Sequence, residues 1–149
     1  MDHVQMLWEI EQIKTLKARY FRLMDTQDWA GWTLLFTEDC VATFPRPIGW
    51  DHAGEPFTIT GRERLGSYLR DLFHDGGRSV HHGHMPEIEL MAHDQARGTW
   101  AMFDYVDRHD SRKMGYGHYH DDYRRQGAGP WAIAATRLTR LREDDLRSA

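Results

Sequence analysis

Residues 79–90 have the sequence SVHHGHMPEIEL, which carries three of the ten histidines of the chain within four positions. The segment ends in Glu87-Ile88-Glu89-Leu90, an alternation of polar and apolar residues that is typical of a half-buried strand. Imidazole has an ordinary pKa closer to neutral pH than any other side chain, so this cluster indicates proton transfer or metal binding. The alternative interpretation is a surface strand that happens to be rich in histidine.

Strand patterns continue from this stretch to the end of the chain. We predict strands over roughly 79–90, 96–107, 114–126 and 131–142, separated by short turn signals such as the segment 126–130, QGAGP. Long strands joined by short turns favour an antiparallel, strongly curved sheet.

The first half of the chain has the spacing of helices. Apolar residues from Met6 to Met24 recur at a helical period, Asp28 can cap a second short helix, and Gly61 precedes a third. Between them we predict a strand over 40–44, a proline-rich loop, and a short strand over 57–59. The whole predicts one α+β domain over residues 1–149, with three helices covering one face of the sheet and a cone-shaped cavity between the layers.

Composition narrows the class of partner. The chain of 149 residues has a net charge of −4 with both signs interspersed, which argues against nucleic acid as a partner. Six Trp, six Tyr and six Phe could line a pocket for a flat, hydrophobic molecule. The single cysteine, Cys40, is expected to be a small core residue, and without a membrane-length apolar run or a signal peptide we expect a cytoplasmic protein with no membrane partner.

Two candidate site residues lie on the first helix. Tyr20 belongs to its apolar stripe and should point inward, where a buried phenol needs a hydrogen-bond partner. Asp25 lies five residues on, near the expected helix end, and could face the same space. A core tyrosine and a helix-end aspartate are the alternative interpretation of the pair.

The histidine strand offers two faces. Because side chains alternate along a strand, His82 and His84 share one face and His81 points to the other, although a bulge at Gly83 could reverse the assignment. Only one of these sets can point into the cavity, and the alternation does not decide which.

Asp104 is the third candidate. It shares a strand face with Trp100 and Met102, and a carboxylate on an apolar strand is costly to bury without a partner. A histidine on the neighbouring strand would complete a His–carboxylate pair, whereas a solvent-facing aspartate is the alternative. Further along, His118 and His120 share a face that could add a polar group to the cavity, and Trp50 in the proline-rich loop could lie at the pocket rim.

Several short segments also occur in a characteristic order, and with them the chain resembles the SnoaL-like group of the nuclear transport factor 2-like superfamily. These segments are Ile10-Glu11-Gln12-Ile13-Lys14 to Ala18-Arg19-Tyr20, the turn from Asp25 to Trp29 with Phe36-Thr37-Glu38-Asp39 after it, His81 ahead of Pro86-Glu87-Ile88, and Gly129-Pro130-Trp131-Ala132-Ile133. The resemblance implies a cone-shaped α+β barrel in which a curved antiparallel sheet wraps a long first helix.

Within that superfamily the functional likeness is to scytalone dehydratase and bile-acid 7-alpha-dehydratase, and the Tyr20/Asp25 and His81/Asp104 spacings resemble those of the bile-acid enzyme. The resemblance implies catalytic roles for Tyr20, Asp25, His81 and Asp104. His81 (or His82) would remove a proton, Asp104 would orient it, Tyr20 would hydrogen-bond the developing oxyanion or leaving oxygen, and Asp25 would act as general acid or position a hydroxyl. Trp50, His82, Trp100, Met102 and His118 are the expected substrate-binding residues.

Three hypotheses follow for the function. The first is a lyase (dehydratase) or isomerase that needs no cofactor and acts on a hydrophobic cyclic molecule, steroid-like or polyketide-like; the second is a binding or oligomerisation domain without chemistry. The third is a cupin-like metal site at Gly76, His82, His84 and Glu89, which the missing second motif disfavours, since the chain has no asparagine. We expect no metal, and a homodimer or homotrimer, because a curved sheet leaves an outer face to cover.

Overall fold

The computed structural model describes residues 1–47 and 51–147 of the chain. Three helices and six strands follow one another in the order expected for an α+β domain. They are α1 (His3–Asp25), α2 (Trp29–Thr33), β1 (Phe36–Pro45), β2 (Pro56–Thr60), α3 (Arg62–Leu72), β3 (Arg78–Ala92), β4 (Gln95–Arg108), β5 (Ser111–Arg124) and β6 (Ala132–Asp145).

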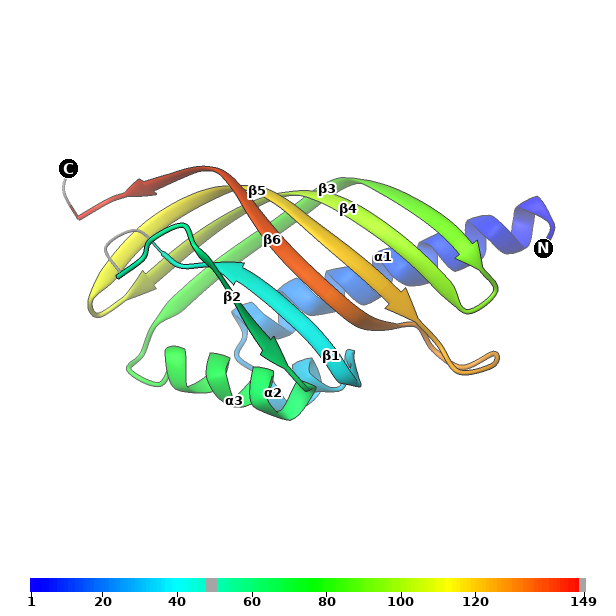
Figure 1. The fold of residues 1–149 in the computed structure, drawn as a ribbon, viewed down its shortest axis with the longest axis horizontal. Helices are drawn as coiled ribbons and strands as arrows, with labels where there is room; N and C mark the ends of the chain where they lie inside the picture. Colours follow the sequence, from blue (N-terminus) through cyan, green and yellow to red (C-terminus); the bar gives the residue numbers. More distant parts are fainter. Residues whose placement is uncertain (48–50, 148–149) are drawn as a thin grey trace.

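The six strands form one curved sheet in the order β2-β1-β6-β5-β4-β3 (Figure 1). The expectation of a wholly antiparallel sheet is wrong at one pair, because β1 and β6 run parallel. Both strands start at the same end of the sheet, where the amide of Ile133 donates to the carbonyl of Leu35 over 2.9 Å. The sheet is strongly curved but not closed, so it forms an open half-cone rather than a complete barrel.

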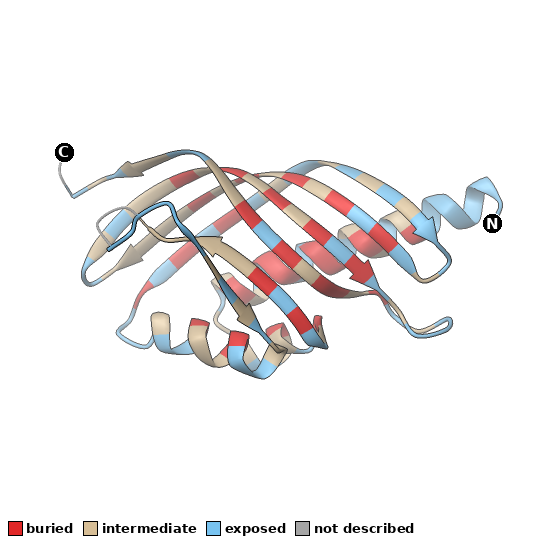
Figure 2. Ribbon diagram, viewed as in Figure 1, coloured by how far each residue is buried: buried red, intermediate tan, exposed pale blue. Residues whose placement is uncertain are grey.

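The helices cover the concave face of this sheet at opposite edges. α1 packs along β3, whereas α3 packs against β1 and β2 (Figure 1). The Asp2 side chain caps α1 by accepting from the amide of Gln5 over 2.8 Å. The first turns of α1 extend beyond the sheet and are exposed, and burial begins with Glu9 and Ile13 (Figure 2). A space between the two helical edges is therefore left over the middle of the sheet.

A bulge in β3 decides which side chains face the core. The pairing with β4 shifts register between His84 and Glu87, and Met85 within this step has a φ of 47°. Before the bulge Ser79 and His81 are buried, and after it the even-numbered residues turn inward. The expected bulge at Gly83 lies two residues further on. Gly83 instead faces the Phe21 ring, which a Cβ atom at this position would overlap.

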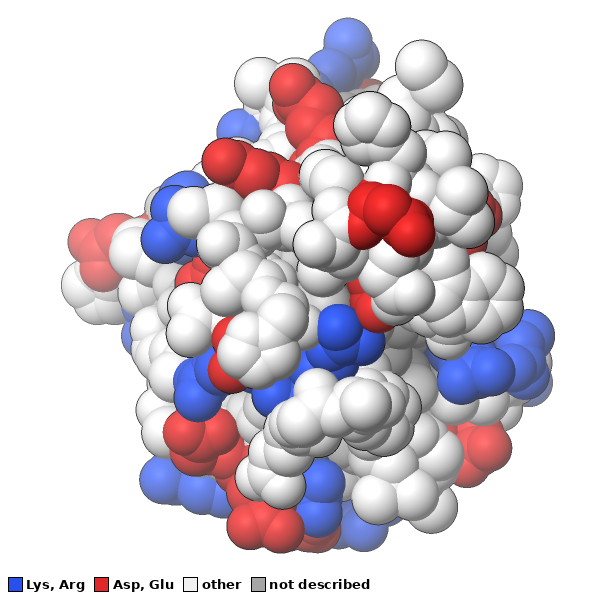
Figure 3. All heavy atoms as spheres, turned by 90° about the vertical axis from the view of Figure 1, so that its right-hand side faces the viewer, with Lys and Arg blue, Asp and Glu red and all other residues white. Residues whose placement is uncertain are grey.

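The surface agrees with the mixed charge of the sequence. Figure 3 shows acidic and basic side chains interspersed on the end of the molecule where α1 begins. None of the helices in the described ranges is long and apolar enough to cross a membrane. Cys40 is fully buried, as expected, and burial, with a smaller contribution from Asp39, raises the pKa of its thiol to about 11.

Candidate active site

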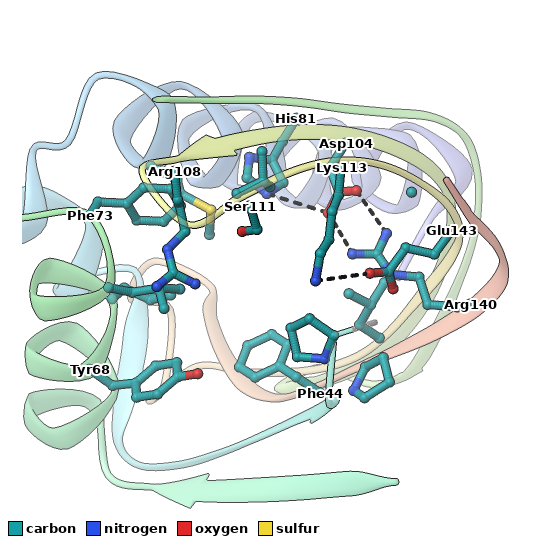
Figure 4. Close-up of a pocket in the computed structure, with 18 of the residues that line it drawn as sticks. Phe44, Tyr68, Phe73, His81, Asp104, Arg108, Ser111, Lys113, Arg140 and Glu143 are labelled. Carbon is teal, nitrogen blue, oxygen red and sulfur yellow. Dashed lines mark hydrogen bonds and ion pairs between the residues drawn. The ribbon is translucent and has the colours of Figure 1, made fainter. Parts of the chain in front are cut away.

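A cavity of about 130 Å³ lies between the concave face of the sheet and α3 (Figure 4). One wall is apolar and is built by side chains from β1, β2 and α3 and by the residue after α3. It includes Phe44, Phe57, Tyr68, Leu69, Leu72 and Phe73. The facing wall is polar and comes from α1 and strands β3 to β6. It includes Tyr20, His81, Asp104, Arg108, Ser111, Lys113, Tyr119, Arg140 and Glu143.

His81 is held from behind by the carboxylate of Asp25. Its Nδ1 lies 2.7 Å from Oδ1 of Asp25, and its backbone amide donates to Oδ2 over 2.8 Å. The hydroxyl of Ser79 donates to the same carboxylate over 2.9 Å. Because an ionised carboxylate only accepts hydrogen bonds, Nδ1 carries the proton, and in the neutral ring Nε2 is the acceptor. The last residue of α1 therefore fixes the tautomer and orientation of a histidine on β3.

Nε2 of His81 faces a second carboxylate, which is itself paired. Oδ2 of Asp104 lies 3.8 Å from Nε2, and Arg140 donates to the two oxygens of Asp104 over 2.8 Å each. Burial opposes the charge of Arg140, but its hydrogen bonds to Asp104 outweigh this and raise its pKa. Arg140 reaches from β6 across β5 to β4 because Gly115 lies opposite Asp104, and a Cβ atom there would overlap the guanidinium.

Tyr20 presents a buried hydroxyl to the same cavity. The side chain is fully buried, and its hydroxyl lies within hydrogen-bonding reach of the Tyr119 hydroxyl. Burial, followed by the neighbouring Tyr119 and Asp121, raises the pKa of Tyr20 well above 10. The phenol therefore stays protonated, and it can donate either to Tyr119 or to a ligand oxygen in the cavity. The ammonium of Lys17 lies 4.0 Å from the centre of its ring, which fixes the ring from the other side.

Two further cations lie where the cavity is more exposed. The side chains of Arg108 and Lys113 are 17% and 12% exposed, against 7% for His81 and 5% for Asp104. Nζ of Lys113 lies 3.7 Å from Glu143. Burial lowers the pKa of Lys113, with Glu143 acting in the opposite direction.

The structure brings Tyr20, His81 and Asp104 together on one cavity and places Asp25 directly behind His81. The contacts of the two aspartates differ from those expected. Asp25, and not Asp104, makes the orienting hydrogen bond to the imidazole, so it does not face the cavity as a general acid. Asp104 is bound to Arg140 instead. His81 enters the cavity rather than His82, because the strand is regular up to the bulge after His84.

The expected substrate-binding residues lie elsewhere. Trp100 and Met102 share the inward face with Asp104, as expected, but are buried in the core, where the Trp100 indole donates to the Tyr123 hydroxyl over 2.8 Å. His82 and His118 lie on the outer face of the sheet, because their positions alternate with inward-facing ones. Trp50 lies outside the described residues.

Sequence reasoning missed Arg140, Arg108 and Lys113. Arg140 lies within the strand predicted over 131–142, but the sequence gives it no role at a site. A usable signal was present in Gly115, since a glycine on an inner strand indicates a close approach, here by the side chain of Arg140, whereas Gly117 faces the backbone of Thr139. Arg108 lies two and four positions from Val106 and Asp104, so alternation alone places all three on one face.

The histidines of the cupin-like pattern do not form a ligand set. His82, His84 and Glu89 are exposed on β3. Within the described ranges, no three His, Cys, Asp or Glu side chains are placed to hold a metal ion. The spacing that resembled a metal motif is therefore that of an exposed strand face.

The family model for the SnoaL-like domain matches residues 5–137, so the chain belongs to the SnoaL-like family. Rv3472 of Mycobacterium tuberculosis, a protein of unknown function, is 33% identical, with a TM-score of 0.75 over 95% of this chain and 78% of that one. This relative shares the fold and a third of the sequence, but its own function is unknown, so it indicates no activity for this chain.

More distant structures with the same fold include named enzymes. A "Putative Scytalone Dehydratase" from Novosphingobium aromaticivorans is 19% identical, with a TM-score of 0.76 over 93% of this chain and 88% of that one. A hexachlorocyclohexane dehydrochlorinase from Novosphingobium barchaimii is 14% identical, with a TM-score of 0.79 over 99% and 97% of the two chains. At these identities the likeness shows the fold, which also carries elimination enzymes.

Proposed function

We propose that the protein is a lyase or isomerase that uses its own side chains for acid–base chemistry on a hydrophobic cyclic small molecule. The observation that carries the proposal is His81, whose Nδ1 is fixed by Asp25 at 2.7 Å while its ring lines the cavity. A base buried in a cleft and oriented by a carboxylate is the arrangement that proton transfer requires.

His81 acts first as the base. Nε2 takes a proton from a carbon next to a carbonyl or enol, and the electrons of that C–H bond form a double bond. The ring then carries a positive charge between Asp25 and Asp104, at 2.7 and 3.8 Å, which stabilise it. The protonated ring gives its proton either to a departing hydroxyl, which leaves as water, or to another carbon, which completes an isomerisation.

Tyr20 supplies the hydrogen bond that the developing charge needs. Its hydroxyl is buried and protonated beside that of Tyr119, so a substrate oxygen in the cavity can accept from it in place of Tyr119. The apolar wall of Phe44, Tyr68 and Phe73 binds the ring of the substrate and excludes water.

Hydrogen–deuterium exchange tests the proposal without knowledge of the full reaction. A panel of cyclic ketones and β-hydroxyketones is incubated with the protein in D₂O, and deuterium uptake is followed by mass spectrometry. We expect catalysed exchange at the carbon next to the carbonyl, lowered by roughly 10²–10⁴ in His81→Gln. His82→Gln is the matched control, because His82 is the next residue but lies on the outer face. Equal exchange by wild type and His81→Gln would contradict the proposal.

A binding protein without chemistry is the second candidate. The observation that favours it is the pairing of Asp104 with Arg140, which already neutralises one carboxylate of the cavity. Calorimetric binding of panel members with no exchange in D₂O would favour this candidate.

A further inference from the structure

The cavity beside His81 is small, and its size bears on which cyclic molecules can reach the base. We propose that the substrate is a monocyclic carbonyl compound, with a ring no larger than six-membered, and that Tyr68 and Leu72 of α3 set this limit. The inference rests on the proposed function, since it names the substrate class of the same cavity.

The volume of the cavity matches a single ring. It is about 130 Å³, slightly less than the roughly 150 Å³ of an apolar cavity that holds one benzene molecule in another protein. Tyr20, His81 and Asp104 lie on one wall and the aromatic side chains on the facing wall, so a bound ring lies between them. Such a ring can present its carbonyl oxygen to Tyr20 and the neighbouring carbon to His81 without leaving the cavity.

The aromatic wall is held in place by further rings. Figure 4 shows Tyr68 projecting from α3 toward the cavity. The Tyr68 ring packs on Phe57 with ring centres 5.7 Å apart, and Phe57 packs on Phe44 at 5.9 Å. Leu72 lies one turn further along α3 and lines the same cavity. A larger ligand would therefore have to displace a packed group of side chains.

Other residues of the lining are held as firmly. Phe73 is 4% exposed and stacks on Trp29, with ring centres 6.0 Å apart and 19° between the ring planes. On the facing wall, Arg140 makes two hydrogen bonds to the carboxylate of Asp104. Closely packed side chains resist displacement, and forcing extra atoms among them is unfavourable. The fold therefore fixes the volume of the cavity.

The more exposed end of the cavity does not suit a second apolar ring either. It is lined by Arg108 and Lys113, which form salt bridges with Asp110 at 3.6 Å and with Glu143 at 3.7 Å. A fused ring that projected there would cover these charged groups, which are costly to remove from water. A fused bicyclic or steroid-like molecule is therefore disfavoured both inside the cavity and at its exposed end.

The test compares one ring with two. Calorimetry on the full chain measures the binding of cyclohexanone and of 2-decalone, a fused bicyclic ketone. A larger apolar molecule binds more tightly where space allows, because it buries more apolar surface. We expect the opposite order in the wild type, with 2-decalone bound roughly tenfold more weakly, because its second ring meets a packed wall. Tyr68→Ala and Leu72→Ala each remove a half-buried side chain from this wall, so each should raise the affinity for 2-decalone relative to cyclohexanone by roughly tenfold.

Tyr116→Ala is the matched control. It removes the same side chain as Tyr68→Ala, but Tyr116 lies on the outer face of β5, packs on Phe103 with ring centres 5.4 Å apart, and does not line the cavity. This variant should keep the order of affinities seen in the wild type. Wild-type binding of 2-decalone as tight as that of cyclohexanone, no binding of either ketone, or an unchanged order in both α3 variants would overturn the inference.

The size limit and the proposed chemistry can fail separately. His81→Gln keeps the apolar wall and should keep the preference for cyclohexanone. A preference for one ring without catalysed exchange in D₂O would contradict the proposed function alone. Catalysed exchange of 2-decalone at the rate of cyclohexanone would contradict the size limit alone.

Discussion

Two clusters of charged and polar side chains lie near Tyr20, and they differ in burial and in how many of their hydrogen-bonding groups have partners within the protein. The sealed cluster consists of Lys17, Trp100, Asp121, Tyr123 and Thr136. The pocket cluster consists of Asp25, His81, Asp104 and Arg140. Both contain a cation, a carboxylate and several hydrogen bonds, so burial of charge alone does not separate a structural network from a site.

In the sealed cluster every side of the charge is occupied by protein. Lys17 and Asp121 are 0% exposed and lie 2.7 Å apart. Asp121 also accepts from the hydroxyls of Tyr123 and Thr136, over 2.8 and 2.6 Å. The ammonium of Lys17 lies 4.0 Å from the ring centres of both Tyr20 and Tyr119. This cluster ties α1 to strands β4, β5 and β6 and lines no part of the cavity.

In the pocket cluster, some donors and acceptors make no hydrogen bond within the described part of the protein. Nε2 of His81 faces the cavity, and Nε of Arg140 has no hydrogen-bond partner in the described ranges. Buried polar groups are almost always satisfied in folded proteins, so unsatisfied ones beside a cavity indicate a ligand. The ammonium of Lys17 also lacks a well-aligned hydrogen bond, but it faces the Asp121 carboxylate and two aromatic rings rather than a cavity. Unsatisfied groups therefore mark the site only where they lie beside a cavity. The variants below should therefore separate stability from activity.

Removal of the ammonium from the sealed cluster should give the largest effect. Lys17→Met keeps most of the side-chain volume but leaves the Asp121 carboxylate buried without its cation, so we expect the free energy of unfolding to fall by about 3–5 kcal/mol. Urea denaturation measures it. Lys14→Met is the control, since Lys14 pairs with Glu11 on the exposed side of the same helix. That change should cost less than about 1 kcal/mol. Similar losses in the two variants would show that the sealed cluster does not stabilise the fold.

Removal of the Asp25 carboxylate behind His81 should lower activity strongly and stability only slightly, in contrast to Lys17→Met. Asp25→Asn no longer balances the charge that His81 acquires, so we expect catalysed exchange in D₂O to fall on the order of 10²–10³. The free energy of unfolding should fall by only about 2 kcal/mol: the partly exposed carboxylate accepts three hydrogen bonds, and the amide nitrogen of asparagine cannot accept those made to the oxygen it replaces. A rate equal to that of wild type would contradict the orienting role.

Asp28→Asn provides the matched control for this variant. Asp28 caps α2 by accepting from the amide of Gly31 over 2.9 Å, and asparagine caps a helix about as well as aspartate. We therefore expect neither rate nor stability to change appreciably, although the same charge is removed three residues away.

The layers of the fold could be predicted because each element carries its own local pattern. The helical spacing of Ile13, Leu16 and Tyr20 buries one face of α1, and the alternation in β4 and β5 buries one face of each strand. The parallel pairing of β1 with β6 could not be predicted in this way. It joins segments almost a hundred residues apart, and no local pattern records which way they meet.

Site residues could be predicted where the alternation of side chains along a strand, or their helical spacing, decides which way they face. Contacts made by long side chains across neighbouring strands could not be predicted in this way. Tyr20 and Asp104 lie on inward stripes that the sequence shows directly. The choice between His81 and His82 depended on the position of a bulge, which lies at Met85 and not at Gly83. Arg140 binds Asp104 from two strands away, through space left by Gly115, and such a contact follows only from the assembled sheet.

Glu9 on α1 is a second carboxylate buried within the protein. The pH dependence of its contribution to stability tests whether its hydrogen-bond donors hold it in the charged form. Glu9 is 3% exposed and accepts from Trp131, Arg125 and Gln5, over 2.7, 2.7 and 2.6 Å. Burial alone would raise its pKa, but these donors outweigh burial and lower the pKa from 4.5. A carboxylate whose pKa is lower in the folded chain than in the unfolded chain stabilises the fold above its ordinary pKa. That contribution is lost as the pH falls through the lowered value.

Glu9→Gln should therefore be less stable than wild type by about 2 kcal/mol at pH 7, with the difference shrinking below pH ~4. Urea midpoints of both proteins from pH 7 to pH 3 measure this difference. Glu11→Gln removes an exposed carboxylate on the same helix and should leave a small, nearly constant difference over that range. A gap for Glu9→Gln that stays constant down to pH 3 would mean that its donors do not hold the charged form. In that case the hydrogen-bond donors around the buried Glu9 carboxylate would not stabilise its charged form, and burial would not distinguish Glu9 from the carboxylates of the pocket cluster.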